Sequence, residues 1–171
     1  MANTYVLISS NTLSSSAASV TFSSIPSTYT DLVLKVSVRS DRANTQDDVR
    51  ITFNSTTTNY SYTYLRGSGS AAISGSSTTD PWEWFGNMDA ANATSNTFAN
   101  GELYIPSYLA SQNKPTSAIM AMEDNVSSPV YLTANANLWR NTAAITSITL
   151  ALGFGNFVSG SSFYLYGIKN S

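Results

Sequence analysis

Carboxylates and tryptophans alternate in the middle of this chain. Asp80 and Glu83 flank Pro81 and Trp82, and Trp84 follows directly. Carboxylates beside aromatic rings are the combination that proteins use to hold and cleave sugars. The alternative is that the tryptophans cover one end of a β-sandwich core or fill a subunit interface, where aromatic residues are enriched. We favour this alternative over catalysis and expect no enzyme activity, while plain contact with a carbohydrate stays open.

Three tyrosines stand at alternate positions just before this stretch. Tyr60, Tyr62 and Tyr64 fall in a β-prone run, so all three are expected on one face of a strand. Their size and polar tips suit a buried interface with a partner. Cross-strand aromatic packing within one sheet explains the pattern equally well. Together with Trp82 and Trp84, these tyrosines are the candidate residues for contact with a partner or a glycan.

The remaining acidic groups predict no metal site. Asp41, Asp47 and Asp48 lie in one polar segment and carry oxygen ligands, but the spacing is not that of a calcium-binding loop. Glu123 and Asp124 are adjacent, and adjacent residues on a strand point to opposite faces. We interpret these carboxylates as parts of solvated turns and strand ends. No metal and no other cofactor is expected.

The composition excludes several classes of function. The chain has no histidine and no cysteine, so it cannot form a Ser-His-Asp triad, a Cys-His pair, an imidazole or thiolate metal site, or a disulfide. Charged residues make up only 11% of the chain and the net charge is −2, which gives no basic surface for nucleic acid. No apolar run approaches the roughly 18 residues of a membrane span. The amino terminus does not resemble a secretory signal, and synthesis in the cytoplasm is expected.

Hydrophobic alternation predicts a chain made almost entirely of β-strands. The clearest pattern places Leu32, Leu34, Val36 and Val38 on one face of a half-buried strand. At the end of the chain, residues 163–168 carry bulk on both faces, which predicts a central strand paired on both sides. Strands are predicted at residues 4–8, 19–23, 32–39, 49–54, 60–65, 102–105, 117–123, 130–138, 144–152 and 163–168.

One domain covering residues 1–171 is expected, because 42% hydrophobic content is enough to fill a two-layer interior. The count of about nine to eleven short strands favours an all-β, antiparallel, jelly-roll-like β-sandwich. Residues 67–79 are small and polar, and they are interpreted as a mobile loop.

Three stretches form a distinctive combination: Thr12–Pro26 with Tyr29–Leu34, Asn96–Asn100 leading to Tyr104–Tyr108, and Phe163–Ile168. In this combination the chain resembles small virion structural proteins of tailed bacteriophages. The resemblance involves both ends and the middle of the chain. It implies a non-enzymatic β-sandwich or jelly-roll building block of the phage particle.

On this resemblance, the first expectation is a capsid decoration (cement) protein that stabilises the head, lies on its surface and is made in the host cytoplasm. Its partners would then be further copies of itself, as a trimer, and the major capsid protein of the shell. The alternative is a tail or head-fibre module that binds a host-surface glycan through Trp82, Trp84 and the segment 67–79.

Overall fold

The computed structural model describes residues 4–125 and 130–169, and in this part of the chain all regular structure is β-strand. The twelve strands of these residues are β1 (Tyr5–Thr12), β2 (Ser19–Phe22), β3 (Asp31–Val38), β4 (Gln46–Phe53), β5 (Tyr60–Gly67), β6 (Ala72–Asp80), β7 (Glu83–Asp89), β8 (Ala99–Ile105), β9 (Lys114–Met122), β10 (Tyr131–Trp139), β11 (Ile148–Leu152) and β12 (Ser162–Ile168). The described residues contain no helix that could span a membrane.

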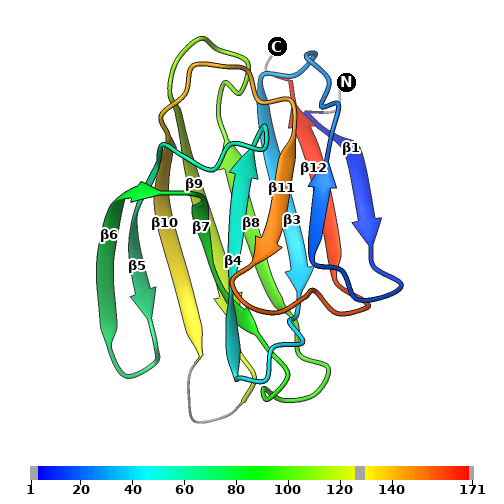
Figure 1. The fold of residues 1–171 in the computed structure, drawn as a ribbon, viewed down its shortest axis with the longest axis vertical. Coiled ribbons are helices and arrows are strands. Elements are labelled where there is room, and N and C mark those ends of the chain that lie inside the picture. The colour runs from blue at the N-terminus through cyan, green and yellow to red at the C-terminus, as the bar shows by residue number, and fades with distance from the viewer. Residues whose placement is uncertain (1–3, 126–129, 170–171) are drawn as a thin grey trace.

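The strands form two antiparallel sheets packed face to face (Figure 1). The larger sheet has eight strands in the order β1-β12-β3-β8-β9-β10-β5-β6, and the smaller has four in the order β2-β11-β4-β7. Eight of these strands pair from the outside of the sequence inward: β1 with β12, β2 with β11, β3 with β8, and β4 with β7. This nested pairing is the wrapping of a jelly roll, so the predicted all-β, jelly-roll-like sandwich is confirmed. We call these eight strands the jelly-roll frame.

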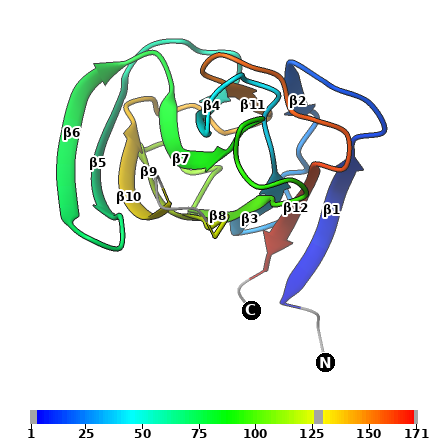
Figure 2. The ribbon, with the colours of Figure 1, turned by 90° about the horizontal axis from the view of Figure 1, so that it is seen from below.

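Two hairpins are inserted into this frame. The β5–β6 hairpin follows β4, and the β9–β10 hairpin follows β8. Both join the larger sheet beyond β8, in the order β9-β10-β5-β6. Figure 2 shows that the extended sheet bends, so that β5 and β6 stand beside the edge of the smaller sheet at β7.

The core lies between the inner faces of the two sheets. Leu32, Leu34 and Val38 of β3 are fully buried, as their alternation predicted. The terminal strand β12 pairs with β1 on one side and β3 on the other, which confirms it as an internal strand. Phe163 and Leu165 of β12 are buried in the core, whereas Tyr164 on its outer face is 36% exposed.

The prediction of a mobile loop over residues 67–79 is wrong. Strand β6 occupies most of this segment and pairs with β5 in unbroken register from Gly67–Ala72 to Tyr62–Ser77. The turn between the two strands is short and is closed by a hydrogen bond from the Ser68 amide to the Ala71 carbonyl (3.0 Å). The side chains of β6 are small and mostly exposed, so neither burial nor alternation marks the strand in the sequence.

Candidate functional site

The candidate site is a cleft where the β5–β6 hairpin stands beside β4 and β7. It has a volume of about 270 Å³ and is lined by Asp48, Arg50, Tyr62, Tyr64, Arg66, Asp80, Trp82 and Trp84. We call it the aromatic cleft. Figure 2 shows the elements that supply these residues, with β5 and β6 on one side and β4 and β7 on the other.

Three aromatic rings pack together in the cleft. The Trp84 ring centroid lies 4.8 Å from that of Tyr64, in an edge-to-face arrangement, and 5.8 Å from that of Tyr62. Alternation along β5 places both tyrosines on the same face, as predicted. Gly75 of β6 lies opposite Tyr64, and a Cβ atom at Gly75 would come within 2.8 Å of the tyrosine ring. The glycine therefore leaves the space in which the Tyr64 ring lies.

A polar network holds Trp84 from β4. The Trp84 indole N–H donates to Asp48 Oδ1 (3.3 Å), and Asn87 Nδ2 donates to the same oxygen (2.8 Å). Arg66 in turn donates to Asn87 Oδ1 (3.0 Å). Burial raises the pKa of the Asp48 carboxyl, an effect that the Trp84 hydrogen bond and the charge of Arg50 partly offset.

Arg50 and Trp82 form the opposite wall. The guanidinium carbon of Arg50 lies 4.0 Å from the centroid of the Trp82 ring, a cation–π contact. In the described chain the ion pairs are Lys35–Glu102 and Arg42–Asp47, so neither arginine of the cleft is neutralised by a direct carboxylate contact.

Two polar atoms of the cleft are shielded from solvent and have no hydrogen-bond partner among the described residues. These atoms are Arg66 Nε, a donor, and Asp80 Oδ2, an acceptor. Burial and the negative charge of Asp80 raise the pKa of the neighbouring Tyr62 hydroxyl. Because both atoms are covered by protein, a ligand in the cleft would meet the other polar atoms of these two side chains.

The structure brings together four of the five candidate contact residues, namely Trp82, Trp84, Tyr62 and Tyr64. Tyr60 is the exception, because it is fully buried in the core, and its prediction as a contact residue is wrong. Its hydroxyl accepts from the Phe53 amide (2.8 Å) and donates to the Thr56 carbonyl (3.1 Å). The shared face of β5 thus runs from the core at Tyr60 into the cleft at Tyr62.

Arg50 and Arg66 were not predicted from the sequence as residues of a site. Arg50 alternates with the apolar residues Val49 and Ile51, which marks it as outward-facing, but only the fold places it beside Trp82. Asp48 was considered only as a calcium ligand.

Glu83 does not line the cleft. Its side chain is fully buried, where it accepts a hydrogen bond from Thr116 (3.0 Å), and burial raises its pKa to about 8. Asp80, by contrast, lines the cleft. The two carboxylates weighed as a catalytic pair therefore do not line a common surface.

Asp41 and Asp47 anchor loops, but Asp47 is fully buried and Asp124 is 1% exposed, so the interpretation of these two as solvated residues is wrong. Asp41 accepts from the Asn156 amide (2.7 Å), and Asp47 accepts from Ser40 (2.8 Å) and from the Gly155 amide (2.9 Å). Over the described residues no three carboxylates gather in a way that could hold a metal ion.

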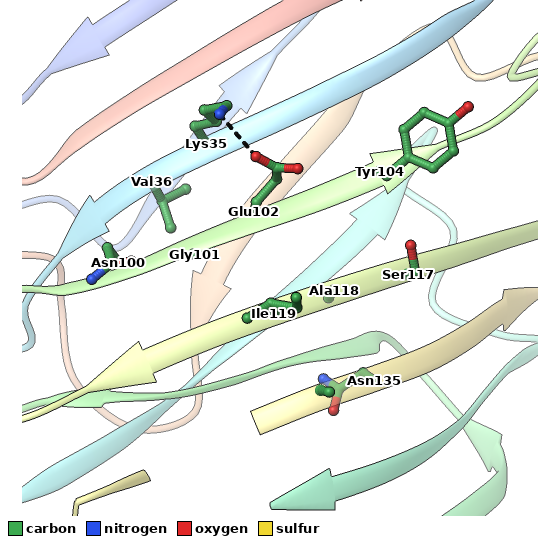
Figure 3. Close-up of a pocket in the computed structure, with 11 residues that line it drawn as sticks. Lys35, Val36, Asn100, Gly101, Glu102, Tyr104, Ser117, Ala118, Ile119 and Asn135 are labelled. Carbon is green, nitrogen blue, oxygen red and sulfur yellow. Dashed lines mark ion pairs between the residues drawn. The ribbon is translucent and has the colours of Figure 1, made fainter. Parts of the chain in front are cut away.

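A second hollow lies on the outer face of the eight-stranded sheet, across β3, β8, β9 and β10. Its volume is about 630 Å³, and Figure 3 shows its lining. Lys35 and Glu102 form an exposed ion pair at 2.8 Å on one side, and Ile119, 58% exposed, lies on the other. Tyr104 is the one aromatic side chain in its lining, so the hollow offers less aromatic surface than the aromatic cleft.

Comparison with known proteins gives no family. No protein-family model matches the chain, and no curated protein matches it. Among solved structures, the galectin LEC-6 of Caenorhabditis elegans is similar at 8% identity and a TM-score of 0.34, over 98% of this chain and 96% of that chain. The CBM2 module of the evolved Dit of Lactobacillus casei BL23 phage J-1 is similar at 9% identity and a TM-score of 0.22, over 90% and 69%. At these TM-scores neither likeness bears on the function of this chain.

Proposed function

We propose that this chain is a non-enzymatic carbohydrate-binding module and that the aromatic cleft is its sugar site. The observation that carries the proposal is the meeting, in one small cleft, of aromatic rings with two arginines and two aspartates. A sugar ring has apolar C–H faces and a rim of hydroxyl groups, so it matches both features at once.

The roles of the residues follow from their positions. Trp84 is only 9% exposed and forms the floor, whereas Trp82 and Tyr62 are half-buried and offer surface for stacking. Sugar hydroxyl groups donate to the Asp80 carboxylate and accept from the Arg50 and Arg66 guanidinium groups, which line the cleft.

The charge and size of the cleft define the ligand class. The two arginines and two aspartates of the lining cancel in formal charge, which favours an uncharged sugar over an acidic one. The volume of about 270 Å³ lies just below the range of about 300–1,000 Å³ for sites that enclose drug-sized ligands. We therefore expect recognition of one sugar unit, such as the end of a host-surface glycan.

Binding to a glycan array, followed by titration of the best ligand with tryptophan fluorescence, tests this proposal. Trp82→Ala is expected to weaken binding at least tenfold, about 1.4 kcal/mol. Tyr164→Ala is the matched control, because Tyr164 is an exposed aromatic residue on the distant outer face. An array without signal, or equal loss in both variants, contradicts the proposal.

A second candidate function is capsid decoration, and a different surface favours it. Six of the eight large hydrophobic side chains that are exposed in the described chain lie on the outer face of the eight-stranded sheet: Tyr5, Leu7, Leu65, Ile119, Leu132 and Tyr164. The exposed charges on the strands of this face are Lys35 and Glu102, which neutralise each other. A broad, neutral and partly apolar face is typical of a surface that packs against another protein.

In this second candidate, the protein is a homotrimer that covers the major capsid protein on the head of a phage. The resemblance noted in the sequence motivates it. Electron microscopy of the source particle with an antibody against this chain tests it. Signal spread over the head supports decoration, whereas signal confined to the tail supports the glycan-binding module and contradicts decoration.

A further inference from the structure

Strand β6 forms an open edge of the larger sheet. It ends the strand order β1-β12-β3-β8-β9-β10-β5-β6, so β5 is its one strand neighbour within the described fold. In an antiparallel pair, alternate backbone N–H and C=O groups point away from the neighbouring strand. Over nine residues, Ala72–Asp80, β6 therefore presents a row of backbone groups that can pair with a further strand.

Strand β6 lacks most of the usual protection of such an edge. Proteins block open edges with lysines, prolines, bulges or covering loops. Strand β6 has no lysine or proline, and its one charge, Asp80, stands at its end. The bulge in β6 lies near that end, where Thr78 and Thr79 stand against Ser61, and the register over residues 72–77 is unbroken. The opposite edge, β1, has its irregularity in mid-strand, between Leu7 and Ser9.

We infer that β6 pairs antiparallel with β6 of a second copy of this chain, so that two eight-stranded sheets join into one. From Ala72 to Thr79 the strand is uncharged, so two copies meet without repulsion. An antiparallel pair of identical strands has a two-fold axis, which closes the assembly at a dimer. Pairing also brings a second strand next to Ile73, which is 37% exposed in the single chain.

The expected dimer is small and reversible. A strand of nine residues is about 30 Å long, and one sheet layer is about 10 Å thick. Edge pairing then buries about 300 Å² per copy, or about 600 Å² in total, which is below the roughly 1,200 Å² of stable complexes.

The dimer has a consequence for ligand binding that rests on the proposed carbohydrate function, whereas the pairing itself does not. The β5–β6 hairpin supplies Tyr62, Tyr64, Arg66 and Asp80 to the aromatic cleft. Two paired hairpins therefore carry two clefts on one particle, and a surface with many copies of a glycan is bound by both at once.

Sedimentation over a wide range of protein concentration, combined with charged edge variants, tests the inference. Ser74 and Ser76 lie on the outer face of β6, opposite Leu65 and Thr63 of β5. The wild-type chain is expected to dimerise with rising concentration. Ser74→Lys with Ser76→Lys, and separately Ser74→Glu with Ser76→Glu, are expected to weaken dimerisation at least tenfold, because like charges meet across the two-fold axis.

The decisive experiment is to mix the two charged variants. An equal mixture of the lysine and glutamate variants is expected to restore the dimer, since opposite charges then face each other. The matched control is Ser61→Lys with Thr63→Lys, one strand further in, which is expected to dimerise like the wild type.

A wild-type chain that stays monomeric at every concentration overturns the inference. So does a trimer, or any assembly that the edge lysines leave intact. Binding of a free monosaccharide by the lysine variant separates the two proposals. A monomeric variant that still binds the sugar supports the sugar site in the cleft. A wild-type dimer that binds no sugar supports the edge pairing and contradicts the sugar site.

Discussion

The jelly-roll frame and the inserted β5–β6 hairpin divide the molecule by chemistry. In the frame, strands such as β3 and β4 bury apolar side chains completely at alternate positions. In the hairpin, none of the nine residues of β6 is buried, and one residue of β5 is buried. Yet the hairpin supplies four of the eight residues of the aromatic cleft. The frame provides stability, and the insertion provides polar and aromatic groups that a core could not hold.

The hairpin is attached to the frame by a group of buried aromatic residues. The ring of Trp139, at the end of β10, lies 5.5 Å from that of Phe53 in β4 and 6.2 Å from that of Tyr60 at the start of β5. All three residues are fully buried. Their packing fixes the direction in which β5 leaves the core toward the cleft.

Truncating Trp139 is expected to have the largest effect on folding. Trp139→Ala removes a fully buried indole and leaves a cavity, which costs about 3–5 kcal/mol of the free energy of unfolding. Urea denaturation followed by circular dichroism measures the loss. Trp82→Ala, in the half-buried wall of the cleft, is the control and is expected to cost about 1 kcal/mol or less. Equal losses would mean that core and cleft do not differ in the way described.

Glu83 is expected to make the free energy of unfolding depend on pH. Its pKa is raised by burial from about 4.5 to about 8, so between these values the folded chain holds a proton that the unfolded chain has released. The free energy of unfolding therefore falls as pH rises through this window, by up to about 1.4 kcal/mol per pH unit. Below pH 4.5 both states hold the proton and the effect disappears.

Glu83→Gln is expected to remove this pH dependence and to be more stable than the wild type at pH 8. Urea denaturation at a series of pH values measures it. Glu102→Gln is the control, because Glu102 is exposed on the outer face, and it is expected to keep the wild-type slope. A Glu83→Gln curve parallel to that of the wild type would show that Glu83 titrates normally.

The strands of the frame could be predicted because their signal is local. Leu32, Leu34, Val36 and Val38 alternate with more polar residues, and one buried face is enough to produce that pattern. The nested pairing of the jelly roll could be expected only as a class, because nothing local specifies which strands become neighbours.

The cleft could be predicted only in part, because burial there depends on the bend of the larger sheet. Tyr60 and Tyr62 are both tyrosines on the same face of β5, but Tyr60 is buried in the core whereas Tyr62 lines the cleft. All seven residues of β7 are buried, because β5, β9 and β10 lie beside it, so Glu83 is inside although it is an acidic residue. Strand β6 was missed because its pairing with β5, rather than any buried face, makes it a strand.

The smallest expected effect is a difference in stability loss between alanine substitutions at two glycines, one beside the cleft and one in the core. In Gly75→Ala the new methyl group meets the outer end of the Tyr64 ring, a side chain that can move, so the stability loss is about 1 kcal/mol or less. In Gly101→Ala, within the frame, the methyl group meets Met120 and Phe85 side chains and comes within 3.2 Å of the Ile119 carbonyl oxygen, which costs about 1–3 kcal/mol.

Because Tyr64 packs on Trp84, Gly75→Ala is also expected to change tryptophan fluorescence and to weaken binding of the cleft ligand. Gly101→Ala is expected to leave both unchanged at pH values and temperatures where it remains folded. If Gly75→Ala left the fluorescence unaltered while destabilising the protein as much as Gly101→Ala, the hairpin would be as rigidly packed as the frame.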